Sequence, residues 1–229
     1  MSEKADNGCS VDEQERLKNV KFRSGLDATA KYIKTFSMDF ERKNVKLTWE
    51  LAFEMDSVAA IIYHSTKKQL LCVKQFRPAV MVRQLMRRPE NKGKSLDELH
   101  VENETCSIGY TVELCAGLCD KPNLSPSEVM REEILEECGY NVKLDQLEHV
   151  CTTTDVSASG AMQHVYFVVI SEENKQNSGG GNASEGEFIE KVWLDIDKLE
   201  ETIRTLHGPP LLHYGLQFFM AQKRHLYLK

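Results

Sequence analysis

The sequence contains no long apolar run and no apolar leader. Of its 229 residues 41% are hydrophobic, yet no stretch approaches the roughly 18 apolar residues that a helix needs to span a bilayer. The first residues, MSEKADNGCSVDEQERLKN, are polar and charged and lack the apolar core of a signal peptide. We therefore expect no membrane partner and a cytoplasmic protein.

Positive charge is also scarce. The 29 Lys and Arg residues are outnumbered by 35 Asp and Glu residues, which gives a formal net charge of −6. A protein that binds nucleic acid without regard to sequence needs a basic surface, so we expect no nucleic-acid partner. An anionic ligand would instead require a locally basic site or a bound metal ion.

The seven cysteines are odd in number and scattered along the chain. The closest pair, Cys115 and Cys119, is followed by no histidine at zinc-finger spacing. We therefore expect neither a disulfide framework nor a structural zinc site. Reduced thiols are typical of a cytosolic protein.

The chain does contain a series of short β-rich runs and two helical patterns. Residues 1–25 are expected to be disordered, 26–56 to form N-terminal strands, and 57–229 to form the main domain. In that domain, 84–108 is predicted to be an inserted loop and 171–186 a flexible one. The predicted strands cover 31–40, 45–53, 57–63, 69–76, 110–117, 147–154, 163–170 and 187–194, and the predicted helices 126–138 and 209–227. This order predicts an α+β fold or a layered α/β/α sandwich.

The stretch SPSEVMREEILEECGY, residues 125–140, carries four glutamates within six positions. Ser125, Pro126 and Glu128 are typical of a helix start with a capping box. Gly139 stands where a left-handed residue would end the helix. At about 100° per residue, apolar side chains fall on one side of this helix and a carboxylate stripe on the other.

Two explanations of this stripe are open: a solvated face, as in most Glu-rich helices, or a cation site. Like charges one turn apart repel by roughly 0.2–0.5 kcal/mol per pair, and no Lys or Arg stands four residues further on to relieve them. The helix also follows a strand that ends in a tight Ala-Gly turn, and an acidic loop occurs later in the chain. Convergent carboxylate oxygens suit a hard divalent cation such as Mg²⁺ or Mn²⁺.

The segment GLCDKPNLSPSEVMREEILEECGY, residues 117–140, resembles the Nudix box, G-x5-E-x7-R-E-U-x-E-E-x-G-U. Its second half, EILEECGY, agrees at every fixed position. Its first half differs, because it has one residue more, and Asn123 stands at the place of the first Glu. Glu132 stands at the place of the Arg that helps orient the box glutamates in the family, and Arg131 beside it is a candidate substitute.

Further motifs extend the resemblance over about residues 30–225. VKQFRPAV is similar to the Q-x-R strand of the ADP-ribose and nucleoside-diphosphate-sugar pyrophosphatases, and EGEFIEKVWL to their catalytic loop. ELCAG resembles their E-x-P-A-G segment, with Cys115 at the place of Pro, and TWELAF resembles a strand whose Trp stacks on a base. Together the motifs look most like the UDP-glucose pyrophosphatase branch. The resemblance implies the Nudix-type α/β/α sandwich with a mixed sheet, preceded by N-terminal strands.

The resemblance also implies roles for the acidic residues. Glu133, Glu136 and Glu137 would bind the metal ion together with the main-chain carbonyl of Ala116. The ion would be Mg²⁺ or Mn²⁺. Glu185 or Glu187 would be the catalytic base or a further ligand, unless the pair belongs to an exposed acidic loop. We favour Glu187, because it directly precedes the strand FIEKVWL.

Three other residues are candidates for substrate binding. Arg77 would hold a phosphate oxygen, since a guanidinium matches phosphate geometry; the alternative is a surface arginine. Trp49 would stack on the base, or it would be a core or interface aromatic. Glu113 would contact the substrate or anchor Arg77, or it would be plain strand surface. The family's sugar pyrophosphatases are usually homodimers in which the N-terminal strands reach across, so a homodimer is expected.

Three functions remain in competition at this stage. The first is Mg²⁺-dependent hydrolysis of UDP-sugars, such as UDP-glucose, to UMP and sugar 1-phosphate. The second is an ADP-ribose pyrophosphatase that yields AMP and ribose 5-phosphate. The third is a weakly catalytic nucleotide-sugar-binding protein. Glu132 at the Arg position favours the third, whereas the intact cluster of Glu133, Glu136 and Glu137 favours the first two.

Overall fold

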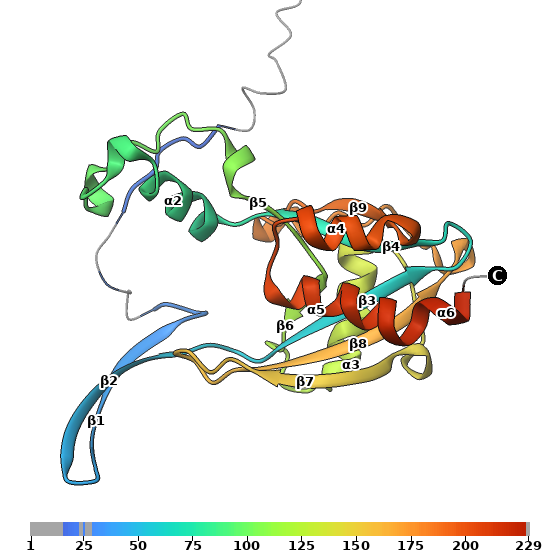
Figure 1. The fold of residues 1–229 in the computed structure, drawn as a ribbon, viewed down its shortest axis with the longest axis horizontal. Helices are drawn as coiled ribbons and strands as arrows, with labels where there is room; N and C mark the ends of the chain where they lie inside the picture. Colours follow the sequence, from blue (N-terminus) through green and yellow to red (C-terminus); the bar gives the residue numbers. More distant parts are fainter. Residues whose placement is uncertain (1–15, 23–24, 26–28, 228–229) are drawn as a thin grey trace, which may run out of the picture. The chain divides into compact units, whose positions relative to one another are not determined.

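The computed structural model describes residues 16–22, 25 and 29–227. The chain divides into two compact units, and each is described by itself (Figure 1). We call residues 16–22 and 76–111 the insert unit, and residues 25, 29–75 and 112–227 the sheet unit. Residues 1–15, for which disorder is expected, lie outside the described part of the chain.

The sheet unit is built on a mixed sheet of seven strands. The strand order is β5-β4-β3-β8-β7, with β6 also paired to β3 and β9 to β4. β3 and β8 run parallel, whereas the β3–β4, β3–β6, β4–β9 and β7–β8 pairs are antiparallel. The strands are β3 (Ser57–His64), β4 (Gln69–Phe76), β5 (Tyr110–Glu113), β6 (Cys115–Leu118), β7 (Glu148–Thr154), β8 (Met162–Ile170) and β9 (Glu190–Asp195). The single strand predicted over 110–117 is therefore two strands, divided at Leu114.

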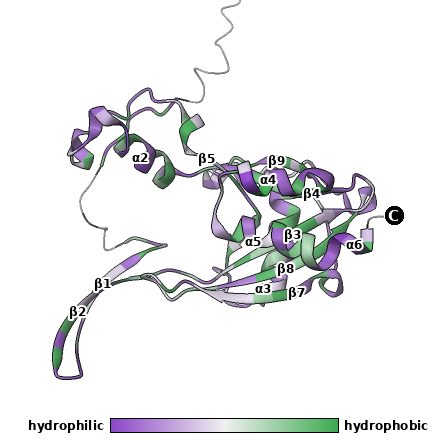
Figure 2. Cartoon of the chain, viewed as in Figure 1, coloured by the Kyte–Doolittle hydropathy of each residue, from purple (hydrophilic) through white to green (hydrophobic). Residues whose placement is uncertain are grey.

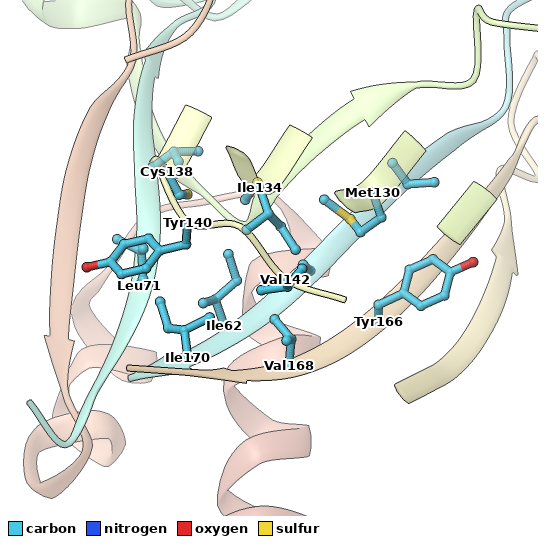
Figure 3. Packing of buried hydrophobic residues seen from close by; sticks show 14 of the residues in the cluster. Ile62, Leu71, Met130, Ile134, Cys138, Tyr140, Val142, Tyr166, Val168 and Ile170 are labelled. Carbon is cyan, nitrogen blue, oxygen red and sulfur yellow. The ribbon is translucent and has the colours of Figure 1, made fainter. Parts of the chain in front are cut away.

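The central strand β3 is apolar on both faces. Every side chain from Val58 to Tyr63 is at most 1% exposed, as expected for a strand that is covered on both sides. One face packs against α3 (Pro126–Glu133) and the turn η4 (Ile134–Cys138). Figure 3 shows this core, in which Met130, Ile134 and Cys138 of the helix face Ile62, Val168 and Ile170 of the sheet.

The opposite face of the sheet packs against the C-terminal helices. Leu212, Leu216 and Phe219 bury their side chains against residues of β3 and β8 such as Ile61 and Phe167. The elements here are α4 (Leu199–Thr205), α5 (Pro210–Phe218), η9 (Phe219–Lys223) and α6 (Arg224–Tyr227), introduced by the short turn η8 (Ile196–Lys198). Helices on both faces of a mixed sheet confirm the predicted α+β sandwich (Figure 1). The sequence pattern missed α4, which has only seven residues.

Strands β1 (Lys34–Arg42) and β2 (Val45–Phe53) form a separate two-stranded sheet, close to the predicted strands 31–40 and 45–53. Lys43 and Asn44 join them with φ of 53° and 63°, the backbone of a tight hairpin turn whose twist matches the strands. Residues that face each other share one side of the hairpin. On one side these are nearly all apolar, for example Met38 opposite Trp49, and the other side is polar.

The insert unit contains more regular structure than the sequence predicted. Helix α2 (Pro78–Met86) starts before the expected loop 84–108, and that loop itself contains the turns η1 (Pro89–Asn91), η2 (Leu96–Glu98) and η3 (Cys106–Gly109). Met81, Leu85, Leu99 and Val101 form a small core, against which Leu17, Val20 and Phe22 pack. Single turns leave no periodic pattern in a sequence, so the prediction found only the polar character of this segment.

None of the helices in the described part of the chain combines the length and the apolar character that crossing a membrane requires. The six described cysteines are all free, and three of them, Cys72, Cys115 and Cys138, are buried.

Candidate active site

The helix that carries the glutamates begins as its sequence predicts. The Ser125 hydroxyl accepts a hydrogen bond from the main-chain N–H of Glu128, and the Glu128 carboxylate accepts one from the Ser125 N–H, 2.8 Å away. Pro126 occupies the first turn. The helix ends at Gly139, whose φ of 82° is left-handed. Caps of this kind typically stabilise a helix by about 1 kcal/mol, and they fix where the glutamates lie along the chain.

The last turn of this helix is wider than an α-helix. Ile134–Cys138 is a π-turn, a local widening that is frequent at functional sites. The ideal 100° spacing places Glu137 on the carboxylate stripe, but in the structure Glu137 is buried, only 2% exposed, while Glu136 is exposed. Val129 of the same helix is buried in the core. The extra width of the π-turn explains why a regular helical wheel misplaced Glu137.

The structure brings Glu133 and Glu137 against strand β6. The main-chain N–H of Ala116 donates a hydrogen bond to Glu137 Oε2 at 3.2 Å. The Cys115 thiol also donates a hydrogen bond to the Glu137 carboxylate. Glu133 lies directly over Gly117, where a Cβ atom would come within 2.2 Å of the carboxyl carbon of Glu133. A glycine is therefore required at 117 for this close approach.

The electrostatic state of these carboxyls is unusual. Burial, followed by repulsion from Glu136 and Glu187, raises the pKa of Glu133 to about 7. Burial, aided by repulsion from Glu133 and Glu187, raises the pKa of Glu137 to about 8, against the opposing hydrogen bonds from Cys115 and Ala116. Burial and repulsion from Glu187 also raise the pKa of Glu136. Crowded acids with raised pKa values are typical of functional sites.

The loop glutamates differ in their relation to this cluster. Glu187 is half-buried, and its charge raises the pKa values of Glu133, Glu136 and Glu137 alike. Glu185, at the end of the turn η7 (Ala183–Glu185), is exposed, and its charge acts on Glu136. Glu187 therefore acts electrostatically on all three helix glutamates, whereas Glu185 acts on Glu136.

The donor set fits a hard divalent cation. In the described part of the chain, no three His, Cys, Asp or Glu side chains are close enough together to enclose a metal ion by themselves. Mg²⁺, however, is commonly held by one or two carboxylates and completed by water and by phosphate oxygens of the substrate. Glu133 and Glu137 supply carboxylate oxygens as ligands, and a bound cation would offset the burial and repulsion that raise their pKa values.

A cation that the sequence pattern missed lies at the edge of this cluster. The Lys121 ammonium forms an ion pair with Glu132, and its charge lowers the pKa values of Glu133 and Glu136, partly offsetting the upward shifts. Arg131, the candidate substitute for the missing box arginine, instead lowers the pKa of Glu128. The box arginine would itself carry a positive charge. Glu132 instead keeps the positively charged Lys121 ammonium beside the glutamate cluster. Lys121 could be found only by structure, because eleven residues separate it from Glu132.

Two adjoining cavities lie on the sheet unit. The first, of about 440 Å³, is lined by Glu113, Ala116 and Tyr214 among others. The second, of about 480 Å³, is lined among others by Tyr32 and Leu118. Thr153 and Gln163 line both cavities, so the two cavities are neighbours that share these two residues. Ala116 of β6 lines the first cavity and Leu118 of β6 the second, whereas Glu133, Glu136, Glu137 and Glu187 line neither of the two.

The remaining two predicted residues stay predictions. Trp49 is 57% exposed on β2, packs edge-to-face on Phe40, and is not among the residues that line these two cavities. Its position on the apolar side of the hairpin is compatible with either a stacking or an interface role. Arg77 belongs to the insert unit, where it precedes α2, and its N–H donates to the Gly109 carbonyl at 2.8 Å.

Replacing Gly117 with Ala is expected to weaken cation binding while leaving the fold intact. The added Cβ would occupy the place of the Glu133 carboxyl, and this flexible side chain is able to move away. Displacing one ligand group should lower the affinity for Mn²⁺ by about tenfold or more. Electron paramagnetic resonance titration of Mn²⁺ measures this, with the thermal unfolding midpoint as the control for folding. An unchanged Mn²⁺ affinity would show that Glu133 does not bind the ion.

Known proteins resemble this chain over most of its length. No protein-family model matches it. The chain is 29% identical over 205 residues to the uridine diphosphate glucose pyrophosphatase NUDT14 of Mus musculus, which covers 86% of this chain and 92% of that protein. It is 31% identical over 188 residues to the protein of the same name from Bos taurus, covering 80% and 84%. It is 26% identical over 180 residues to the GDP-mannose pyrophosphatase of Salmonella paratyphi B, covering 76% and 78%.

Proposed function

The chain belongs to the Nudix hydrolase family, and from this premise we propose that it is a metal-dependent nucleoside-diphosphate-sugar pyrophosphatase that acts on UDP-sugars. UDP-glucose would be cleaved to UMP and glucose 1-phosphate. The observation that carries the proposal is the pair of Glu137, which is buried, and Glu133, which is half-buried, against Ala116 and Gly117. Of the predicted metal ligands, Ala116 also lines the first cavity, so a substrate bound in that cavity would lie against β6.

Each part of the site has a role in this proposal. Glu133, Glu136 and Glu137, with the carbonyl of Ala116, would hold Mg²⁺ or Mn²⁺. Such an ion neutralises pyrophosphate oxygens and lowers the pKa of the attacking water. Glu187 would accept a proton from that water, and its half-buried place beside the cluster supports this role. The cleavage adds one water across the P–O–P bridge, so that each product keeps one phosphate.

Glu113 would bind the substrate. Glu113 lines the first cavity, where a carboxylate can accept hydrogen bonds from sugar hydroxyls. For Arg77, which belongs to the insert unit, phosphate binding stays the expectation that the family resemblance implies. Because the cluster itself repels an anion, the substrate would depend on the metal ion and on nearby cations such as Lys121.

A panel of substrates tests the proposal. The purified protein is given Mg²⁺ and, separately, UDP-glucose, GDP-mannose and ADP-ribose, and kcat/KM is measured for each from the products. The highest kcat/KM for UDP-glucose supports the proposal. Faster release of AMP from ADP-ribose would assign the chain to the alternative activity. Tight binding of one substrate without turnover would mean that it is a nucleotide-sugar-binding protein.

We further propose that the protein is a homodimer that buries the apolar side of the β1–β2 hairpin. Figure 2 shows hydrophobic segments along the hairpin. On the apolar side, Phe36, Met38, Val45, Trp49 and Phe53 are each 47–58% exposed. An exposed apolar surface of this kind usually marks an interaction site. A second copy of the chain is the partner that the family resemblance favours. The free, partly buried thiols support a reducing compartment such as the cytoplasm.

The Met38→Lys variant is expected to be monomeric, because it places a charge opposite Trp49 in the middle of the apolar side. The matched control is Ser37→Lys, which adds the same charge on the polar side of the same strand. Sedimentation velocity measures the mass, and the wild type and Ser37→Lys should sediment at twice the chain mass of 26.1 kDa. A monomeric wild-type protein would refute the dimer.

A further inference from the structure

The loop between β8 and β9 returns to the end of the glutamate helix. The N–H of Gly180 donates to the carbonyl of Glu137 at 2.9 Å, and the N–H of Gly181 to the carbonyl of Glu136 at 3.2 Å. The N–H of Gln176 donates to the carbonyl of Gly139 at 2.8 Å. The loop thus satisfies carbonyls that the last turn of a helix leaves without a partner, including those of two predicted metal ligands.

The role of the three consecutive glycines, Gly179–Gly181, is to allow this close contact with the helix and not to make the loop flexible. A Cβ atom on Gly179 would come within 2.4 Å of the Glu137 carbonyl oxygen, and one on Gly181 within 2.7 Å of the Ile189 side chain. Both glycines also have a positive φ, 64° and 77°. The sequence predicted a flexible segment over 171–186, but its glycine-rich part is held against the helix by main-chain hydrogen bonds.

A lysine from the following strand ties the two segments together. Lys191 lies on β9, and its ammonium donates to the Cys138 carbonyl at 3.1 Å and to the Ser178 carbonyl at 2.6 Å. The first of these oxygens belongs to the π-turn and the second to the glycine loop. A positive charge at a helix C-terminus is also favoured by the helix dipole. Lys191 is partly buried.

The same loop carries the glutamates of the candidate active site. Ile189 donates its N–H to the carbonyl of Gly180 at 2.9 Å, which closes the loop on itself. Glu187 lies inside the closed part, between Gly180 and Ile189. The hydrogen bonds of the glycines and of Lys191 therefore hold the segment that contains Glu187 against the π-turn.

We propose that Lys191 is a positioning residue, which locks the glycine loop to the π-turn and so sets the place of Glu187 relative to Glu136 and Glu137. The inference rests on the proposed function, because it concerns the base of that reaction. It adds a residue that does not contact the substrate. Misplacing a catalytic group by about 1 Å can lower a rate by roughly a hundredfold, so loss of this lock should be measurable in kcat.

A double-mutant cycle tests the proposal. Lys191→Met is expected to lower kcat for UDP-glucose about ten- to a hundredfold with little change in KM. In the Glu187→Gln background the same change should lower kcat less than about twofold, because the group that it positions is already lost. Lys191→Arg, which keeps a long cationic donor, should recover most of the activity. Lys198→Met, an exposed lysine on η8, is the matched control.

Amide hydrogen exchange provides a readout that does not depend on activity. In Lys191→Met the amides of 178–189 should exchange faster than in the wild type, while those of β3 and β8 stay protected. If Met at this position prevents folding, Lys191→Gln enters the same cycle. A wild-type kcat in Lys191→Met would overturn the positioning role. It would also be overturned if the losses of kcat caused by Lys191→Met and Glu187→Gln simply multiply in the double variant. A wild-type protein without turnover would instead overturn the proposed function.

Discussion

Replacing Glu137 with Gln is expected to abolish metal-dependent hydrolysis, with a loss of roughly a hundredfold or more in kcat/KM. Glu137 is the most buried of the cluster, and its carboxylate accepts the hydrogen bond from Ala116. Glutamine has the same shape but cannot supply a negatively charged ligand. The measurement is the rate of UDP-glucose hydrolysis over a range of Mg²⁺ concentrations.

The fold of the Glu137→Gln variant should be at least as stable as that of the wild type without metal. Burial raises the pKa of Glu137 to about 8, which means that the folded protein disfavours the charged form. Removing a charge that the fold disfavours should not lower the unfolding temperature. Glu200→Gln, on the exposed side of α4, is the matched control and should retain full activity. Wild-type hydrolysis by Glu137→Gln would disprove the metal assignment.

Replacing Glu187 with Gln is expected to have the second-largest effect. Loss of a general base typically lowers kcat by about 10²–10⁴-fold, and KM should change little because Glu187 is not proposed to bind the sugar or the base. The structural reason is its half-buried position, from which its charge reaches all three helix glutamates. Steady-state kinetics at saturating Mg²⁺ measures the effect.

Glu185→Gln is the matched control for this prediction. Glu185 is exposed in the same loop, so its replacement should lower kcat by less than about fivefold, well below the effect of losing a general base. The reverse order of effects would transfer the role of base to Glu185. Full activity in both variants would show that this loop carries no catalytic acid.

The sequence predicted the sheet well because strands buried on one or both faces leave a strong pattern. Val58–Tyr63 is apolar without interruption, and the capping box of Ser125 and Glu128 marks its helix unambiguously. The glutamates were found for a different reason, namely their spacing within a known motif. Their burial was not predictable, because it depends on the π-turn and on the absence of a side chain at Gly117.

What the sequence missed are the contacts between segments that are distant in the chain. Lys121 meets Glu132, and Lys191 meets Cys138, through tertiary structure alone. The glycines at 179–181 have the composition of a flexible linker, yet they are needed for a close main-chain approach to Glu137. Composition cannot distinguish these two uses of glycine, since both need a backbone without a Cβ atom.

The most direct test of the account is a ³¹P NMR time course of UDP-glucose with the purified protein. Reagents are added in sequence: protein alone, then Mg²⁺, then EDTA in excess. The account predicts no change before Mg²⁺, conversion to UMP and glucose 1-phosphate after it, and arrest by EDTA. Release of UDP in place of UMP, or cleavage that continues in EDTA, would contradict the claim that the helix glutamates hold a metal ion for pyrophosphate hydrolysis.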